Sequence, residues 1–527
     1  MQGRSPHVPK PTPARHWRGA THALVFSSVC WLYPLLTPPS AAAVEYHVAP
    51  TGLDTNDGLS AESPFQTIGR GAEVARHGDM ILIHEGIYSE FLVFPHSGTV
   101  DAPIHIQPYL TDLAVIDGSA LSPDFDAPWN RPPLVRVSGN YVTISGLEVR
   151  HAPGDGIFVT GQHVVLFNLH VHHTYLSGVQ FFSTWDGTLS NSNIHDAHDY
   201  GSGGRNADCV SMGWYNDHGR HKVRNNAVYN CADDGIDAWT AYDNLIEGNI
   251  VHHAGFSAEG NGSGFKLGSS AYPFGGRNIV RNNVAYDNKG WGFGSNEGPD
   301  NLVYNNTAFR NGYGNFANWG KPGIYRNNLS VDGGDNLALM SGSHNSWNLG
   351  ILDPLFKSID PTSPDFLRLQ EESPAVDAGA AVGLPFKGRA SDLGAYESDG
   401  SSSLPPSVNL CRVLIPLDLS AAWSDGGFAW GLPVSLGVPA DATLASSTST
   451  IRVFENNTEL GPPHALHADI RSLGHGRFSH YSLPDGTEET LRLSATDNSD
   501  PRTNGRTYAY CTPDSGLKTP RRRTISR

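Results

Sequence analysis

The chain has 527 residues, with 36 Lys and Arg against 52 Asp and Glu, and a formal net charge of −16. This charge argues against nucleic acid or an anionic membrane as the main partner, because phosphate binding requires a basic surface. Charged residues make up only 17% of the chain and hydrophobic residues 39%, which excludes a disordered profile and disfavours a helical bundle.

Residues 1–43 have the pattern of a secretory signal peptide. Four basic residues and no acid precede the apolar run Ala23–Leu36, and the small residues Ala41 and Ala43 suit cleavage before Val44. A short membrane anchor is the alternative, but the run is too short to span a bilayer comfortably. We therefore predict that the protein is secreted or periplasmic. Removing the leader leaves 32 basic against 52 acidic residues.

Between residues 141 and 331 one short sequence unit recurs. Each copy holds an apolar-alternating run, an Asn, a second alternating run and a Gly-centred turn, and many intervals are 22 or 23 residues. Such a period is typical of a solenoid, in which each coil buries its face against its neighbours. Short strands, Asn-rich corners and the missing Leu-x-x-Leu-x-Leu pattern favour a parallel β-helix. The predicted column of stacked Asn amides is Asn168, Asn193, Asn226, Asn249, Asn283, Asn306 and Asn328.

The flanks of the repeat have the features of caps and of a second domain. A helix at Ala72–His77 and a strand at Met80–His84 are expected to cover the first coil, and residues 353–397 to form the last coils. The fold class is all-β. In chain order, the predicted parts are a signal peptide (1–43), the β-helix (44–397), a Ser/Pro linker (398–407), a small β-sandwich-like domain (408–512) and a disordered basic tail (513–527).

Four cysteines remain after removal of the leader. Cys411 and Cys511 bracket the C-terminal domain, and a disulfide between them would close it as one unit. Cys209 and Cys231 do not stack in the predicted register. They are equally consistent with a bridge and with two buried thiols.

A cluster of acids follows from the coil register. Equivalent positions of successive coils lie about 4.8 Å apart. Alignment of the unit at Cys209 with those at Gly235 and Gly264 puts Asp208 in the column of Asp234, and Asp237 in the column of Lys266. Asp233 lies next to this group. These carboxylates would repel one another unless a cation balances them.

The ligand set of the predicted cation site consists of carboxylate oxygens, without thiolates or grouped imidazoles. This chemistry favours Ca²⁺ over Zn²⁺. The alternative is that the Asp-Asp-Gly-Ile-Asp segment is ordinary turn chemistry.

Lys266 is the predicted general base. It points outward between Phe265 and Leu267, beside the presumed cation, in a column that holds Phe158, Gln180, Ser211 and Asp237. A nearby cation disfavours the ammonium form, so its pKa should lie below the usual value of about 10.4. The alternative is a solvated lysine paired with Asp237.

Together these groups suit β-elimination on a uronate polymer. Calcium would neutralise the uronate carboxylate and Lys266 would take the C5 proton while the C4–O bond breaks. Because no water attacks, the enzyme would be a lyase and not a hydrolase.

Three segments carry a resemblance to a known family: Asn206-Ala207-Asp208-Cys209, Ala232–Asp237 and Gly262–Gly268. Across residues 44–397 the chain resembles polysaccharide lyase family 9, the pectate lyases with a right-handed parallel β-helix. The resemblance implies a Ca²⁺ site at Asp208, Asp233, Asp234 and Asp237, proton abstraction by Lys266, and polygalacturonate as substrate. It does not extend to the C-terminal domain.

Other charged residues are weaker candidates. Those that could pair with further substrate carboxylates are Arg205, Arg220, Lys222, Arg224 and Arg277. Residues of this kind are more often simply solvated surface charges. The 24 histidines, including His172-His173 and His252-His253, lack a shared metal spacing and are interpreted as turn and surface residues.

Two rival functions remain open at this point. One is a lyase or epimerase acting on another uronate polymer, such as alginate or a glycosaminoglycan. The other is a non-catalytic β-helix adhesin or carbohydrate-binding protein. The predicted partner is an acidic polysaccharide, with no nucleic acid or membrane, and the protein is expected to be a monomer.

Overall fold

The computed structural model describes most of the chain from residue 43 onward. The described residues are 43–121, 131–214, 218–269, 275–398, 415–436, 440–441, 449, 451–456, 458–460, 465, 467–482 and 489–511. The predicted signal peptide (except residue 43), linker (except residue 398) and basic tail lie outside them. Among the described residues, no helix combines the length and apolar character needed to cross a membrane.

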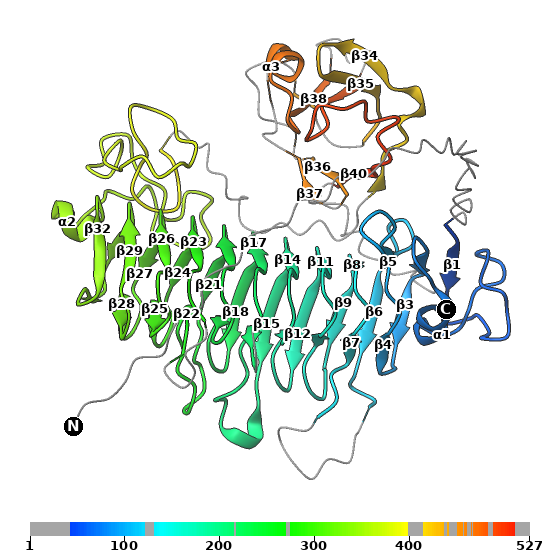
Figure 1. The fold of residues 1–527 in the computed structure, drawn as a ribbon, viewed down its shortest axis with the longest axis horizontal. Helices are drawn as coiled ribbons and strands as arrows, with labels where there is room; N and C mark the ends of the chain where they lie inside the picture. Colours follow the sequence, from blue (N-terminus) through cyan, green and yellow to red (C-terminus); the bar gives the residue numbers. More distant parts are fainter. Residues whose placement is uncertain are drawn as a thin grey trace, which may run out of the picture. The chain divides into compact units, whose positions relative to one another are not determined.

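Three parallel sheets form the walls of a right-handed β-helix, as predicted (Figure 1). Sheet 1 contains β1 (Glu45–Val48), β2 (Met80–Ile83), β5 (Ile104–Pro108), β8 (Val142–Ser145), β11 (Val165–Phe167), β14 (Thr188–Ser190), β17 (Lys222–Arg224), β20 (Leu245–Glu247), β23 (Ile279–Arg281), β26 (Leu302–Tyr304), β29 (Gly323–Arg326) and β32 (Met340–Ser343).

Sheet 2 contains β3 (Gly86–Tyr88), β6 (Ala114–Asp117), β9 (Glu148–Arg150), β12 (His170–Thr174), β15 (Asn193–Ala197), β18 (Ala227–Cys231), β21 (Ile250–His252), β24 (Val284–Tyr286), β27 (Thr307–Phe309) and β30 (Leu329–Val331). Sheet 3 contains β4 (Leu92–Phe94), β7 (Val135–Val137), β10 (Ile157–Val159), β13 (Val179–Phe182), β16 (Val210–Gly213), β19 (Ile236–Ala238), β22 (Phe265–Leu267), β25 (Trp291–Asn296), β28 (Gly314–Trp319) and β31 (Asp335–Asn336). Each coil visits the three sheets in this order.

The core lies inside the coils because alternate side chains of each strand point inward. Stacked apolar side chains fill it. Among them, the rings of Phe265, Phe293 and Phe316 follow one another on sheet 3, with centroids 4.6 and 5.0 Å apart. These rings are almost completely buried, so each stack stabilises the coil below and the coil above it.

Stacked Asn side chains connect the coils at the corner between sheets 1 and 2. The side-chain oxygen of Asn249 accepts from the backbone N–H of Asn226 at 3.1 Å, and that of Asn283 accepts from the N–H of Asn249 at 2.9 Å. These amides satisfy backbone groups that the corner leaves unpaired. The ladder continues through Asn306, Asn328 and Asn345.

Two predicted members of this Asn column are wrong. Asn193 pairs within sheet 2, and Ser192 takes the ladder position, donating its Oγ to one carbonyl and accepting from the N–H of Leu169. Asn168 lies one position earlier and has φ of 54°. Its short polar side chain tolerates this left-handed conformation, which is a different use of asparagine at the same corner.

The predicted cap is present with shifted boundaries. The helix α1 (Ile68–Val74) begins four residues earlier than predicted, because the side chain of Thr67 accepts from the N–H of Arg70 as an N-cap. Ile68 and Ala72 of this helix belong to the main core of the β-helix. Two further short helices are η1 (Tyr200–Ser202), before β16, and α2 (Ser346–Leu349), after the last coil.

The prediction that residues 353–397 form the last coils is wrong. In this segment the structure contains isolated bridges, such as that between Phe356 and Leu369, and no strand. Leu367, Leu369 and Leu393 instead join a separate hydrophobic cluster with residues of sheet 2, including Phe309. The segment therefore covers the outer face of the late coils.

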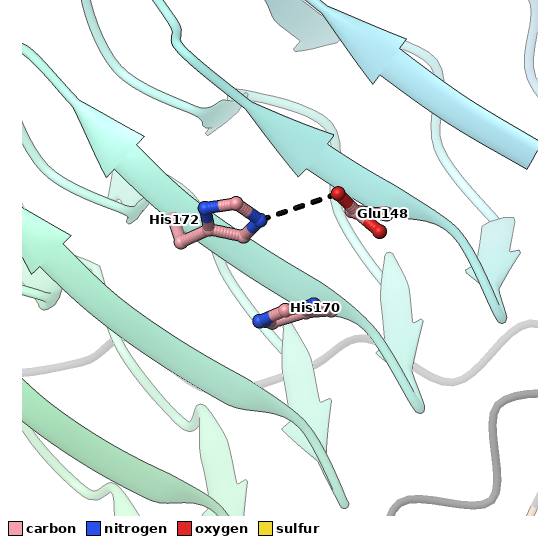
Figure 2. Close-up of side chains that lie close together, drawn as sticks. All are labelled: Glu148, His170 and His172. Carbon is pink, nitrogen blue, oxygen red and sulfur yellow. Dashed lines mark hydrogen bonds and ion pairs between the residues drawn. The ribbon is translucent and has the colours of Figure 1, made fainter. Parts of the chain in front are cut away.

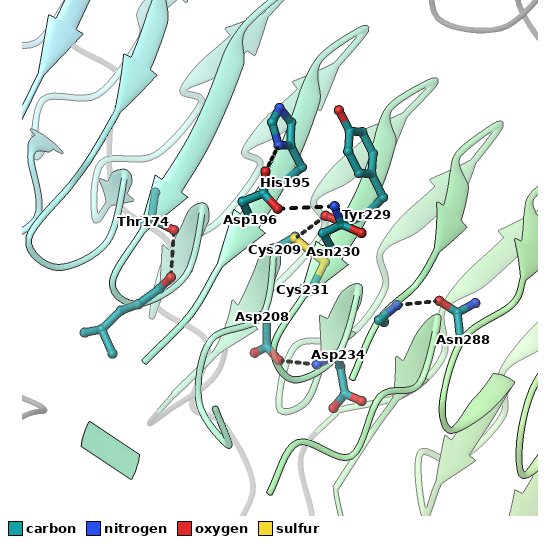
Figure 3. The surroundings of a disulfide bond; sticks show 12 residues. Thr174, His195, Asp196, Asp208, Cys209, Tyr229, Asn230, Cys231, Asp234 and Asn288 are labelled. Atoms are coloured by element: carbon teal, nitrogen blue, oxygen red, sulfur yellow. Dashed lines mark hydrogen bonds and ion pairs between the residues drawn. A yellow bond between two sulfur atoms is a disulfide. The ribbon is translucent and has the colours of Figure 1, made fainter. Parts of the chain in front are cut away.

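A disulfide joins Cys209 and Cys231, a question that the sequence left open (Figure 3). Cys231 ends β18 and stacks on Ala197 of the preceding coil, whereas Cys209 directly precedes β16. The bridge thus crosses the corner between sheets 2 and 3, and it connects neighbouring coils beside Asp208. Cys511 is buried, but Cys411 lies outside the described residues, so their pairing stays a prediction.

The C-terminal region contains two four-stranded antiparallel sheets that share one hydrophobic cluster, consistent with the predicted sandwich. One consists of β33 (Ile415–Pro416), β40 (Tyr508–Cys511), β36 (Arg452–Glu455) and β37 (Thr458–Glu459); the other of β34 (Trp423–Gly426), β35 (Ala429–Pro433), β39 (Glu489–Leu493) and β38 (Phe478–Ser482). Two short helices, η2 (Leu419–Ala421) and α3 (His467–Ser472), accompany them.

Candidate active site

The strands of sheet 3 bring the predicted site residues into one column. Ser211 of β16 pairs with Asp237 of β19, and Asp237 pairs with Lys266 of β22. The same column continues backward through Gln180 and Phe158. The register predicted from the sequence is therefore confirmed over five coils.

Carboxylates and an amine meet at the start of these strands. Oxygens of Asp208, Asp234 and Asp237 all lie within 4.8 Å of one another. The Nζ of Lys266 donates to Oδ2 of Asp234 at 2.9 Å and to Oδ2 of Asp237 at 2.8 Å. The three carboxylates are buried, while the Lys266 side chain keeps 17% of its surface exposed. The amine is thus held by the acids, while part of the Lys266 side chain stays exposed.

Backbone groups at the corner between sheets 2 and 3 hold the carboxylates in place. The N–H of Asp234 donates to Oδ1 of Asp208 at 3.2 Å, as Figure 3 shows, and the N–H of Ser263 donates to Oδ1 of Asp234 at 2.7 Å. Gly235 is required here, because an added Cβ would lie 2.3 Å from Val251 and 2.7 Å from the carbonyl oxygen of Gly264. Tight stacking of the coils therefore fixes the acids.

Asp233 is placed differently from the other three predicted ligands. It is buried, but its oxygens are not among those within 4.8 Å of one another. Its Oδ1 accepts from the N–H of Asn261 at 2.6 Å. Asp233 therefore lies beside the group of three carboxylates rather than inside it.

Burial and mutual repulsion raise the pKa of Asp208, Asp233 and Asp237. Burial is the main cause for Asp208, with repulsion from its three neighbours next, and its pKa lies well above the usual value. In the same way burial raises the pKa of Asp233 to about 8 and that of Asp237 to about 6. An ionised cluster is therefore unfavourable unless positive charge is added.

Lys266 supplies part of that positive charge. Burial lowers the pKa of Lys266, but attraction to the four carboxylates raises it by more, so the net pKa lies well above the usual value. This direction is opposite to the one predicted from the sequence, because that prediction assumes a cation beside the lysine. In the arrangement described, the ammonium itself is the counterion of the acids.

The donor set fits an additional hard cation. Oδ1 of Asp237 is buried and has no hydrogen-bond partner among the described residues. An unpaired buried carboxylate oxygen is unfavourable, and three carboxylates within reach of one ion form the all-oxygen environment that Ca²⁺ prefers. The residues present therefore fit calcium.

The predicted substrate-binding cations are not gathered at this cluster. Arg205, three residues before Asp208, forms an exposed ion pair with Glu259 at 2.9 Å. Lys222 and Arg224 belong to β17 of sheet 1. Arg220 and Arg277 precede β17 and β23 at the corner that leads to sheet 1, where each pairs with an Asp of the preceding coil.

Sequence reasoning missed one buried acid in the same column as Asp208. The hydrogen bonds of Gly156 to Ser177 and of Gly178 to Asp208 place Asp155, Ser177 and Asp208 on consecutive coils. Oδ1 of Asp155 accepts from the N–H of Ser177 at 3.1 Å. Burial raises the pKa of Asp155 to about 7. The signal was present in the register, since this Asp also directly precedes a Gly-centred turn.

Fold and site together define a right-handed parallel β-helix protein with a lysine set among buried carboxylates on one lateral sheet. Residues 46–328 match the family described as "Pel9A-like, right handed beta helix region". The chain therefore belongs to this family, which confirms the resemblance found in the sequence.

Individual relatives agree with the family assignment. Pectate lyase L of Dickeya chrysanthemi is 28% identical over 390 residues, which cover 67% of this chain and 90% of that protein. Pectate lyase PEL9 of Emericella nidulans is 26% identical over 361 residues, covering 60% and 86%. The solved structure of the pectate lyase Pel9A is 26% identical, with a TM-score of 0.60, and covers 68% of this chain and 97% of that one. The chain is thus a pectate lyase-like lyase.

Proposed function

We propose that this protein is a secreted, calcium-dependent lyase that cleaves polygalacturonate by β-elimination. The observation that carries the proposal is the contact of the Lys266 amine with Asp234 and Asp237 on the outer side of sheet 3. Relatives that are named pectate lyases support the substrate class.

Asp208, Asp233, Asp234 and Asp237 are the proposed holders of Ca²⁺, with Asp233 at the margin. Bound calcium supplies positive charge that neutralises a uronate carboxylate and stabilises the charge developing beside C5. Once the charge of the acids is balanced, burial is the remaining influence on Lys266, and burial lowers its pKa. Lys266 can then reach the neutral form that a general base requires.

The reaction of the bound polymer is a balanced elimination. The Nζ of Lys266 takes the C5 proton, and the electron pair of that bond forms the C4–C5 double bond. The C4–O bond breaks, and the leaving oxygen departs with a proton from solvent. The products are a shortened chain and a 4,5-unsaturated uronate, and no water is added.

The test is the ultraviolet absorbance of unsaturated uronate released from polygalacturonate. Wild-type protein is expected to be active with calcium and inactive with chelator. Lys266→Ala is expected to lower the rate by about 10²–10⁴-fold, as for loss of a general base. Lys357→Ala, an exposed lysine outside the coils, is the matched control and should retain full activity.

Three outcomes would contradict parts of this proposal. Activity that persists in chelator would contradict the calcium requirement. Activity that persists in Lys266→Ala would contradict the role of Lys266 as the general base. Product from alginate or a glycosaminoglycan but not from polygalacturonate would contradict the proposed substrate. Binding without product from any uronate polymer favours the non-catalytic rival.

Export is part of the same proposal. The leader at 1–43 is expected to be removed during secretion, because its pattern suits signal peptidase. N-terminal sequencing of protein from culture medium or periplasm should start near Val44. An intact Met1 on the functional protein would contradict export by this route.

A further inference from the structure

Three potential metal ligands converge on sheet 2, away from the sheet that carries Lys266. Glu148 lies on β9, and His170 and His172 lie two residues apart on the same face of β12 (Figure 2). One ligand atom from each of the three lies within 4.8 Å of the others. Strands β9 and β12 are adjacent, with Glu148 opposite His170. The expectation that the histidines lack a shared metal spacing is therefore wrong at this point.

Each ring nitrogen of His172 faces another polar atom. Its Nε2 lies 3.4 Å from Oε1 of Glu148, and its Nδ1 lies 2.7 Å from Nδ1 of His173. The side chains of Glu148 and His172 are only 14% and 12% exposed. His172 is thus held with one nitrogen toward the carboxylate, in a site sheltered from bulk water.

A second chain of contacts sets the tautomer of His170. Oδ2 of Asp196 lies 2.6 Å from Nδ1 of His195, and Nε2 of His195 lies 2.9 Å from Nε2 of His170. An ionised carboxylate only accepts, so a neutral His195 carries its proton on Nδ1 and accepts at Nε2. His170 then donates through Nε2, and its Nδ1 keeps the lone pair. Carboxylate–imidazole chains of this kind orient imidazoles that bind metals.

The charged groups around the cluster have a net negative charge that a dication could balance. Three carboxylates lie here, those of Asp117, Glu148 and Asp196, while Arg150 contributes one guanidinium that pairs with Asp117 at 2.7 Å and Glu148 at 2.8 Å. These four groups sum to two negative charges when the imidazoles are neutral. A divalent ion would balance that sum.

We propose that Glu148, His170 and His172 form a binding site for a divalent transition-metal ion, with Zn²⁺ as the best match. Two imidazoles and one carboxylate are a common zinc ligand set, whereas calcium prefers oxygen ligands alone. The ion would link neighbouring coils through β9 and β12. The site does not share a sheet with Lys266, so it is independent of the proposed lyase reaction.

Calorimetric titration with Zn²⁺ tests the site. The full-length mature chain is used without an affinity tag, after chelator treatment and then with saturating Ca²⁺, so that calcium occupies the acidic cluster of sheet 3. Wild-type protein is expected to bind one Zn²⁺ tightly. Glu148→Gln and His172→Ala are expected to weaken this binding by about tenfold or more, because each removes a ligand.

His252→Ala is the matched control. His252 occupies the same column of sheet 2 as His172, and its Nδ1 also lies 2.7 Å from that of the following residue, His253. In the described part of the chain it belongs to no group of three potential ligands. Zinc affinity of His252→Ala should stay within about twofold of wild type, since no ligand is lost.

Cobalt substitution gives a second readout. Bound Co²⁺ should show visible absorption bands in wild type and His252→Ala and lose them in Glu148→Gln, a near-isosteric change that decides the matter if His172→Ala does not fold. The proposal is overturned if wild type binds no Zn²⁺ in the presence of calcium. It is also overturned if Glu148→Gln binds as wild type does, or if His252→Ala loses binding equally. Pectate cleavage should be unchanged in Glu148→Gln.

Discussion

Two columns of charged residues run along this β-helix, and they differ in how well their charges balance. At the corner leading to sheet 1, Arg220 pairs with Asp186 and Arg277 with Asp243, each at 2.6 Å, and both arginine side chains are 51% exposed. In the sheet 3 cluster, four buried carboxylates share one positively charged side chain among the described residues, that of Lys266. Both columns run along parallel backbone pairings of successive coils. The ratio of acids to bases and the burial differ, so the corner column is balanced while the cluster requires a further cation.

Replacement of Lys266 by Met gives the strongest test of this contrast. In chelator at pH 8, the free energy of unfolding is expected to fall by about 3–5 kcal/mol, because the buried acids lose their counterion. With millimolar calcium the loss should be much smaller. Urea unfolding of both proteins in both buffers measures the difference. An equal loss with and without calcium would show that Lys266 and the cation do not share the same acids.

Asp237→Asn tests the unpaired oxygen of the cluster. Calcium affinity is expected to fall about 100-fold, close to 2.7 kcal/mol, because one ligand loses its charge. Calorimetric titration with Ca²⁺ measures it. Asp243→Asn, which alters an acid of the corner column, should leave the affinity unchanged. A similar decrease in both variants would indicate a general effect of net charge.

The buried carboxyl of Asp155 predicts a pH-dependent effect. Burial raises its pKa to about 7, so the folded state binds the proton more tightly than the unfolded state. Its contribution is present below about pH 4 and is lost as pH rises toward 7. Asp155→Asn keeps the acceptor for Ser177 and should be more stable than wild type at pH 8 by about 2–4 kcal/mol, with no gain at pH 4.

Thermal unfolding in chelator at both pH values checks this prediction. Use of chelator keeps calcium binding out of the comparison. A gain of the same size at pH 4 and pH 8 would mean that ionisation of Asp155 is not the cause.

Arg277→Ala is expected to have the smallest effect. Its ion pair with Asp243 is half exposed, and such pairs contribute about 0–1 kcal/mol. Both stability and the rate of pectate cleavage should stay close to wild type. A large loss of activity with unchanged stability would instead support the predicted role of Arg277 in substrate binding.

The register around Lys266 could be predicted because Gly235 and Gly264 mark equivalent points of neighbouring coils. Once these are aligned, the pairing of Asp237 with Lys266 follows from the parallel ladder. The Asn ladder could be predicted less well. Asn serves both as a ladder residue and as a residue with positive φ, as at Asn168, and the two uses occupy adjacent positions.

Contacts across corners could not be predicted by aligning equivalent positions of successive coils. Cys209 and Cys231 lie on different sides of the corner between sheets 2 and 3, so no single column contains both. The ligands on sheet 2 were missed for a related reason. His170 and His172 are close in sequence, but Glu148 comes from the preceding coil, 22 residues earlier, and joins them only through the pairing of β9 with β12.

The spacing of the Asn ladder shows how the protein can change at its periphery. The step from Ser192 to Asn226 and that from Asn249 to Asn283 are each 34 residues, whereas the step between them is 23. The two long steps contain Asp208 and Lys266. The extra residues leave the rungs undisturbed, so the chain beside the proposed base and its acids can change in length without disturbing the ladder.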